Sequence, residues 1–299
     1  MSDTVIQTNG LTKDYGRGRG IFDIDLEIKK GEVFGYVGTN GSGKTTTIRS
    51  MMGFIKPNSG SSSVLGLDSW EKAPEIMQNV SYIPGEIAFP ALATGTEFLK
   101  SQAEYLGVKD YTYMNHIIEL LQLDPSANLK RMSKGMKQKT AIVAALMGEK
   151  DILVLDEPTT GLDPLMREAF LELIREEKAK GHTIFMSSHI FEEIEEVCDR
   201  VAMIKDGRIV DIANLYDLRH SKTKDFTIAF KNREEAVRFA DHAKYSPVLD
   251  GMVCRATFPT ADIGAFLSML KEYDIQSIHE NKITLEDYFM KAYQKGNIR

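Results

Sequence analysis

A glycine-rich stretch near the N-terminus carries a clear chemical signal. Residues 38–45 read GTNGSGKT and match the phosphate-binding pattern G-x-x-x-x-G-K-[ST]. Glycines let successive backbone N–H groups turn toward an anion, and the start of a following helix favours negative charge. We expect Lys44 to contact the β- and γ-phosphates of a nucleoside triphosphate, and the Thr45 hydroxyl to hold Mg²⁺. The predicted nucleotide-binding residues of this stretch are Gly38, Thr39, Asn40, Gly41, Ser42, Gly43, Lys44, Thr45 and Thr46.

The alternative interpretation of this stretch is a glycine-rich turn that contains a lysine by chance. The flanking residues argue against it, because the apolar run 33–37 precedes the loop and a helical pattern over 45–52 follows it. A strand, a glycine loop and a helix in this order are the context that a phosphate-binding loop needs. The sequence therefore predicts that the chain binds a nucleoside triphosphate.

Two adjacent carboxylates, Asp156 and Glu157, form a second candidate site. The four aliphatic residues 152–155 precede them, as in a parallel strand buried on both faces. Asp156 is placed to hold Mg²⁺ beside Thr45. A second carboxylate next to the metal aspartate is costly unless it accepts a proton, so we predict that Glu157 is the general base for the attacking water. The alternative is that the two acids simply open a surface loop.

The elements that must position these residues follow an α/β pattern. Residues 5–8 and 21–28 predict antiparallel strands, since the second segment alternates apolar and polar side chains. Residues 86–147 are helical in pattern, with Thr94 capping the first helix and Ser133 or a neighbour capping the last. The mostly parallel core sheet is predicted from strands at 33–37, 80–83, 151–157, 183–188 and 201–204, the last forming a hairpin with 208–210 about Asp206-Gly207.

A polar stretch at 220–224 predicts a boundary between two domains, 1–220 and 221–299. The second domain has the element order β-α-β-β-α-β, which predicts a small ferredoxin-like α+β fold. An amphipathic helix over 285–293 closes the chain. This domain either regulates the protein or serves only packing and dimerisation. Its predicted elements are strands at 225–230, 248–251, 252–258 and 275–283, and helices at 233–243 and 262–273.

The run Asp156–Pro164, DEPTTGLDP, resembles the catalytic strand and following loop of ATP-binding cassette (ABC) ATPases. Further motifs follow the family's order over about residues 1–215. Tyr15 lies where the family keeps an aromatic that stacks on adenine, and His189 follows the next strand, where it keeps a switch histidine. The segment 132–138, MSKGMKQ, resembles the signature motif L-S-G-G-Q. The resemblance implies a P-loop NTPase cassette with a helical subdomain over about 86–147.

This resemblance implies that two cassettes dock head to tail on ATP. The signature residues of one subunit would then reach the γ-phosphate held by the other, through the start of the signature helix. Asp163 would contact the partner subunit, and His189 would bind the γ-phosphate or the attacking water. The implied signature residues are Ser133, Lys134, Gly135 and Met136.

The tail segment 284–289, TLEDYF, resembles the C-terminal motif of cassettes that drive type 2 exporters of the drug, antibiotic and bacitracin group. The resemblance implies an ATP-hydrolysing exporter subunit that works as a homodimer or heterodimer. It would lie on the cytoplasmic face of the cell membrane and drive separately encoded permease subunits or one fused pair. The helical region would carry the motion to the permease.

Two positions depart from the family pattern. Lys134 and Met136 stand where the family usually has Gly and Gln, while Ser133 and Gly135 are kept, so we expect function to survive. Pro84-Gly85-Glu86 stands where a metal-coordinating glutamine is normal. Glu86 is then either a Mg²⁺ ligand or a solvent-facing side chain, with water completing the metal shell.

Composition limits the other function classes. The net charge of −6 over 299 residues gives no indication of a nucleic-acid partner, and the distant Cys198 and Cys254 are typical of cytosolic thiols. We expect no signal peptide and no membrane-spanning segment. A soluble ABC ATPase of translation or DNA repair is the alternative function, although such chains usually carry two cassettes or a coiled-coil insertion. A P-loop kinase or GTPase is a further rival, and the near match to the guanine motif at 281–284 lacks its Asp.

Overall fold

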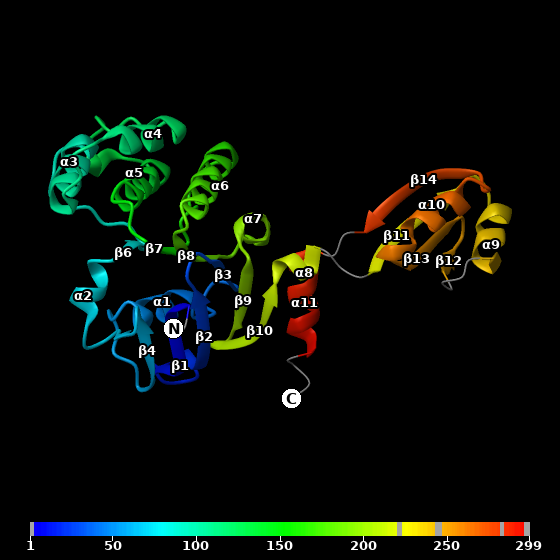
Figure 1. Cartoon of the computed structure of the whole chain (residues 1–299), viewed down its shortest axis with the longest axis horizontal. Helices are drawn as coiled ribbons and strands as arrows, with labels where there is room; N and C mark the ends of the chain where they lie inside the picture. The colour runs from blue at the N-terminus through cyan, green and yellow to red at the C-terminus, as the bar shows by residue number, and fades with distance from the viewer. Residues whose placement is uncertain (1–2, 220–222, 243–246, 282–283, 296–299) are drawn as a thin grey trace. The chain divides into compact units, whose positions relative to one another are not determined.

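The computed structural model describes residues 3–219, 223–242, 247–281 and 284–295 (Figure 1). The chain forms two compact units, one of residues up to Leu215 together with those from Phe289 onward, and one of Tyr216–Tyr288. The first unit thus ends earlier than the boundary predicted near 220. It also takes the end of the final helix, α11 (Leu285–Lys295), because the Phe289 ring packs on Phe191 with centroids 5.1 Å apart.

A six-stranded sheet of order β10-β9-β3-β8-β7-β6 forms the centre of the first unit. Neighbouring strands are parallel except for β10, which forms the predicted hairpin with β9. Every residue of β3, β7 and β8 is buried, which explains their continuous apolar runs. The strands are β3 (Val33–Val37), β6 (Val80–Ile83), β7 (Ile152–Asp156), β8 (Thr183–Ser188), β9 (Arg200–Lys205) and β10 (Arg208–Asn214).

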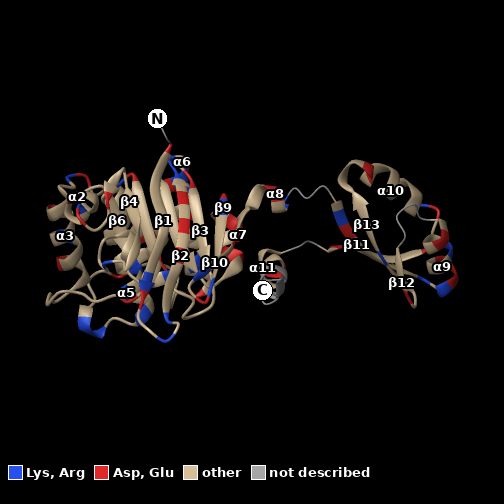
Figure 2. Cartoon of the chain, turned by 90° about the horizontal axis from the view of Figure 1, so that it is seen from below, with Lys and Arg blue, Asp and Glu red and all other residues tan. Residues whose placement is uncertain are grey.

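A second sheet of order β2-β1-β4-β5 is antiparallel. Its apolar side chains share one core with the helix α1 (Lys44–Met51) and one face of the central sheet. Acidic residues recur along β2 on the opposite, exposed side (Figure 2), as the alternating sequence predicts. The strands are β1 (Thr4–Asp14), β2 (Gly20–Lys29), β4 (Ser59–Val64) and β5 (Leu67–Asp68).

Helices connect and cover the strands of the first unit (Figure 1). The predicted cap at Thr94 is confirmed, since its hydroxyl accepts a hydrogen bond from the Glu97 N–H at 3.2 Å. Ser133 caps α5 in the same way through the Met136 N–H. Asp163 caps α6 through the Met166 N–H at 3.0 Å. The helices are α2 (Ala73–Met77), α3 (Gly95–Leu106), α4 (Thr112–Leu120), α5 (Lys134–Leu146), α6 (Pro164–Ala179) and α7 (Phe191–Val197). The short helix α8 (Leu215–Arg219) begins at the last residue of this part of the first unit, and its other residues belong to the second unit.

The second unit has one antiparallel sheet of order β12-β13-β11-β14. This order confirms the ferredoxin-like prediction. Phenylalanine rings from the strands and both helices form its core. Residues 282–283 of the last predicted strand and 243 of the first predicted helix lie outside the described residues. The elements are β11 (Thr223–Phe230), α9 (Arg233–His242), β12 (Val248–Asp250), β13 (Val253–Pro259), α10 (Ile263–Leu270) and β14 (Ile275–Asn281).

None of the helices in the described part of the chain combines the length and the apolar character that crossing a bilayer requires.

Candidate active site

The phosphate-binding loop joins β3 to α1, and its close packing requires glycine. A Cβ at Gly38 would lie 2.5 Å from both the Ser42 hydroxyl and the Ile204 carbonyl. Gly43 has a φ of +113°, in the range that only glycine adopts readily. The Lys44 side chain is only 5% exposed, and its Nζ donates hydrogen bonds to the carbonyls of Gly38 (2.6 Å) and Thr39 (3.2 Å). The loop therefore holds the lysine in place through its own backbone.

Asp156 ends β7 as a fully buried carboxylate. Its Oδ1 accepts a hydrogen bond from the Ser187 hydroxyl at 2.7 Å, and that hydroxyl accepts one from the Glu157 N–H at 3.0 Å. The buried Oδ2 has no hydrogen-bond partner among the described residues. Gly85 lies against this oxygen, since a Cβ there would approach it to 3.1 Å. An orphaned buried carboxylate oxygen is costly, and a cation ligand is one way to satisfy it.

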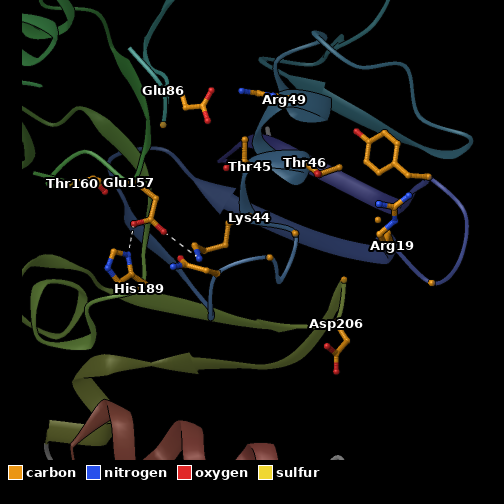
Figure 3. Close-up of a pocket in the computed structure, with 18 residues that line it drawn as sticks. Arg19, Lys44, Thr45, Thr46, Arg49, Glu86, Glu157, Thr160, His189 and Asp206 are labelled. Carbon is orange, nitrogen blue, oxygen red and sulfur yellow. Dashed lines mark hydrogen bonds and ion pairs between the residues drawn. The ribbon is translucent and has the colours of Figure 1, made fainter. Parts of the chain in front are cut away.

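Glu157 links the phosphate-binding loop to the end of β8. Its carboxylate lies 3.1 Å from Lys44 Nζ and 2.5 Å from His189 Nδ1 (Figure 3). The residue has a φ of +51°, a left-handed conformation that costs a non-glycine residue about 1–3 kcal/mol. The Ser187 hydroxyl holds its N–H, and the Thr160 N–H donates to its carbonyl at 3.1 Å. These contacts aim the carboxylate into the cavity beside the loop.

A cavity of about 780 Å³ lies over these residues. It brings together ten of the predicted site residues, and Figure 3 shows several of them as sticks. Tyr15 is half exposed at its rim, with Lys13 Nζ 5.6 Å from the ring centroid. Three other residues of the loop do not line the cavity: Gly38 and Ser42 are buried, and Thr39 is exposed. Asp156 does not line it either and lies against Gly85. The predicted residues that line the cavity are Tyr15, Asn40, Gly41, Gly43, Lys44, Thr45, Thr46, Glu86, Glu157 and His189.

Sequence reasoning missed several lining residues. Arg49 follows Thr45 by four positions on α1, a spacing that puts both side chains on one helix face and could have identified it. Its guanidinium is directed toward Glu86 in Figure 3. Arg49 also contacts Tyr82. Burial and the Asp156 charge raise the pKa of the Tyr82 hydroxyl, whereas the charge of Arg49 and its hydrogen bond lower that pKa. The other lining residues are Gly18, Arg19, Gly20, Gly85, Thr160, Asp206 and Gly207.

The signature segment lies outside this cavity. The Ser133 hydroxyl accepts from the Met136 N–H at 3.2 Å, which leaves its proton free to be donated elsewhere. Gly135 packs against the loop that follows Glu157, since a Cβ there would lie 2.8 Å from the Gly161 carbonyl. Asp163, two residues after Gly161, is the N-cap of α6. The start of α5 and the Asp163 loop are thus packed together, apart from the chain's own cavity.

Comparisons with known proteins agree with this geometry. The family model described as ABC transporter matches residues 21–160. Over 304 residues the chain is 32% identical to the bacitracin transport ATP-binding protein BcrA of Bacillus licheniformis, and the match covers 99% of each chain. The chain belongs to the ABC transporter ATP-binding proteins. As a member of this family it binds and hydrolyses ATP, and the predicted family and cassette fold are confirmed.

Solved structures support the same assignment. One, described as the ATP-binding subunit of an ABC transporter, has a TM-score of 0.64 and 31% identity, and covers 72% of this chain and 92% of its own. Another, a dimeric ATP-binding cassette bound to ADP and phosphate after hydrolysis, has a TM-score of 0.61 and 21% identity. That match covers 70% of this chain and 98% of the other, and it shows the shared fold.

Proposed function

We propose that this ABC ATPase drives an exporter of the drug and antibiotic group by closing as a head-to-tail dimer on ATP. The observation that carries the dimer is the separation of Ser133 from the chain's own cavity, which already holds Lys44, Glu157 and His189. A second copy would supply its α5 start to that cavity, where a helix N-terminus and a free hydroxyl suit the γ-phosphate. The full-length match to a bacitracin transport protein supports the exporter class.

Glu157 is the proposed general base. Its carboxylate is held between Lys44 and His189, so one side faces the phosphate-binding loop. Phosphates that attract Lys44 would release the carboxylate oxygen facing it, and that oxygen could then accept the proton of the attacking water. His189 holds the other oxygen through Nδ1, and with both ring nitrogens protonated it can also donate from Nε2 to the γ-phosphate. The reaction is in-line hydrolysis of the terminal phosphate, with charge neutralised by Lys44 and the helix α1.

The residues present fit a Mg²⁺ ion bound with ATP. The fit rests on the orphaned Oδ2 of Asp156 and on the Thr45 hydroxyl in the neighbouring cavity wall. Thr45 and Asp156 would hold the ion, which neutralises charge on the phosphates. Glu86 lines the same cavity and would either join them or pair with Arg49. Both arrangements keep its negative charge beside a cation.

Tyr15 and the neighbouring glycines would bind the adenine base. The ring is accessible at the cavity rim and carries Lys13 near one face, which leaves the other for stacking. Stacking depends on the face of a base and not on its edge. We therefore expect the site to accept both ATP and GTP, with ATP preferred.

The partners and location follow from the exporter proposal. Separately encoded permease subunits, or a fused pair, would bind this chain on the cytoplasmic face of the membrane. The helical region around α3, α4 and α5 would transmit closure to them. Among the residues that the structure describes, none that lines the cavity belongs to the ferredoxin-like unit, and we propose for this unit a regulatory or dimerising role.

A mixing experiment tests the shared site. Lys44→Ala removes the phosphate contact, and Ser133→Arg blocks the contribution in trans, so each purified variant should lack ATPase activity. A one-to-one mixture should recover about a quarter of parent activity, because half of the dimers are mixed and each has one of two sites intact. The matched control mixes Lys44→Ala with parent protein. No recovery, with both variants folded and able to form mixed dimers, would contradict the head-to-tail site.

A further inference from the structure

A buried glutamate on α7 lies just outside the residues given a catalytic role. Glu193 is 4% exposed, and its Oε2 accepts hydrogen bonds from the hydroxyls of Thr159 (2.9 Å) and Ser188 (3.0 Å). Its Oε1 is buried without a hydrogen-bond partner in the part of the chain that the structure describes. Burying a carboxyl group in this way is costly. Its position therefore calls for a physical explanation.

The two partners of Glu193 belong to the loops that carry the proposed catalytic groups. Thr159 follows Glu157 by two residues, after the end of β7. Ser188 directly precedes His189 at the end of β8, and its hydroxyl also accepts a hydrogen bond from the Ile190 N–H at 2.9 Å. A single carboxyl oxygen thus connects the loop after Glu157 to the loop that contains His189.

Two consecutive serines of β8 make hydrogen bonds on opposite faces of the strand. Ser187 bonds to Asp156 and to the Glu157 N–H, whereas Ser188 bonds to Glu193. Successive side chains of a strand point to opposite faces, so the two serines hold the ends of β7 and β8 together from both sides.

The loop after β7 needs such support because Glu157 has a left-handed φ of +51°. Strained conformations of this kind persist only where the surroundings enforce them. The Thr160 N–H donates to the Glu157 carbonyl, and the Leu162 N–H donates to the Thr159 carbonyl at 3.0 Å, which together form a tight turn. Glu193 anchors this turn through the Thr159 side chain.

We infer that Glu193 is a positioning residue for ATP hydrolysis, which fixes the Glu157 loop relative to the His189 loop. The inference rests on the proposed role of Glu157 as the base. What the two hydroxyls require is an oxygen acceptor, which a carboxamide also provides. Burial raises the pKa of Glu193, while the two hydroxyls and the nearby charges of Arg167 and His189 oppose the shift.

The test measures kcat and the KM for ATP on the full-length protein. Glu193→Ala should lower kcat by about 30-fold to 100-fold, the scale of loss when a catalytic group is misplaced by about 1 Å. The KM for ATP should stay within about threefold of the parent value, because the phosphate-binding loop is untouched. Glu193→Gln should restore kcat to within about threefold of the parent, since its carbonyl oxygen accepts both hydrogen bonds. The matched control is Glu192→Ala, an exposed position on the same helix.

A double variant separates positioning from general damage. Thr159→Val removes one donor at nearly constant volume, and it should lower kcat without raising the KM. Adding Glu193→Ala to it should then cost less than in the parent, because the two residues act through one contact. If Glu193→Ala is too unstable to assay, Thr159→Val alone still tests the inference, since it must lower kcat.

Several results would overturn the inference. They are an unchanged kcat in Glu193→Ala or Thr159→Val, a Glu193→Gln variant as impaired as Glu193→Ala, and losses that simply multiply in the double variant. Glu157→Gln is assayed in the same series. If that variant hydrolyses ATP at the parent rate, the proposed base is wrong, and this result is independent of the Glu193 comparisons.

Discussion

The Ser187 hydroxyl joins the Asp156 carboxylate to the backbone N–H of Glu157, so Ser187→Ala should both destabilise the first unit and impair the site. The hydroxyl is buried, donates to Asp156 Oδ1 at 2.7 Å and accepts from the Glu157 N–H at 3.0 Å. Its removal leaves the buried Asp156 Oδ1 and the partly buried Glu157 N–H without a partner in this contact. Each unpaired group costs about 1–3 kcal/mol, so we expect a loss of about 2–6 kcal/mol in the free energy of unfolding. Neither oxygen of the Asp156 carboxylate would then accept a hydrogen bond from the described residues, because Oδ2 already has no such partner.

Urea unfolding of the full chain, fitted to the transition of the first unit, measures this loss. The matched control is Ser61→Ala on β4, where the side chain is exposed and the change should stay within about 0.5 kcal/mol. The same Ser187→Ala protein should hydrolyse ATP more slowly, since Glu157 loses a bond that maintains its left-handed backbone. A destabilisation below about 1 kcal/mol with normal turnover would refute this account of how the carboxylates are held.

Three further predictions concern the cavity and its support. Tyr15→Ala should weaken ATP and GTP binding by about 1–3 kcal/mol in calorimetric titration, and an unchanged affinity would assign Tyr15 to surface packing. If Glu86 is a Mg²⁺ ligand, Glu86→Ala should slow hydrolysis and raise the Mg²⁺ concentration required, and Glu86→Gln should restore both. Turnover and Mg²⁺ dependence like those of the parent in Glu86→Ala would exclude Glu86 as a ligand. The pKa of Glu193 is raised above its ordinary value of 4.5, so its stabilising contribution is full below that pH and is lost as pH rises through the folded pKa. Glutamine does not ionise, so only the parent should lose stability in this way as the pH rises from 4.5 to 8. The free energy of unfolding of Glu193→Gln should therefore gain on that of the parent, by about 1.4 kcal/mol for each unit by which the pKa of Glu193 is raised. A difference that does not depend on pH would contradict the raised pKa.

The parallel strands were the most predictable part of the fold. The predicted bounds of β3, β6 and β8 match the structure, because each is a short, mostly apolar segment bounded by polar residues, glycine or proline. The caps of α3 and α5 were predictable for a related reason, since the capping side chain bonds to a backbone N–H three residues away. Local chemistry alone fixes such features.

Features that depend on distant contacts were not predictable. β1 extends from Thr4 to Asp14, beyond the predicted 5–8, because pairing with β2 continues through register shifts that break the alternation of side chains. The end of α11 joins the first unit through the contact of Phe289 with Phe191, which its amphipathic pattern could not reveal. The contacts of Glu193 were not predictable either, because its partners depend on how β7, β8 and α7 pack together.

The most direct test of the central claim is the rate of ATP hydrolysis by Glu157→Gln in a single turnover. The amide keeps the shape of the side chain but is a very poor proton acceptor. We predict that the variant binds ATP with parent affinity, hydrolyses it at least about a hundredfold more slowly, and accumulates as an ATP-bound dimer on gel filtration. Turnover close to that of the parent would contradict the assignment of Glu157 as the base and, with it, the mechanism proposed for this cavity.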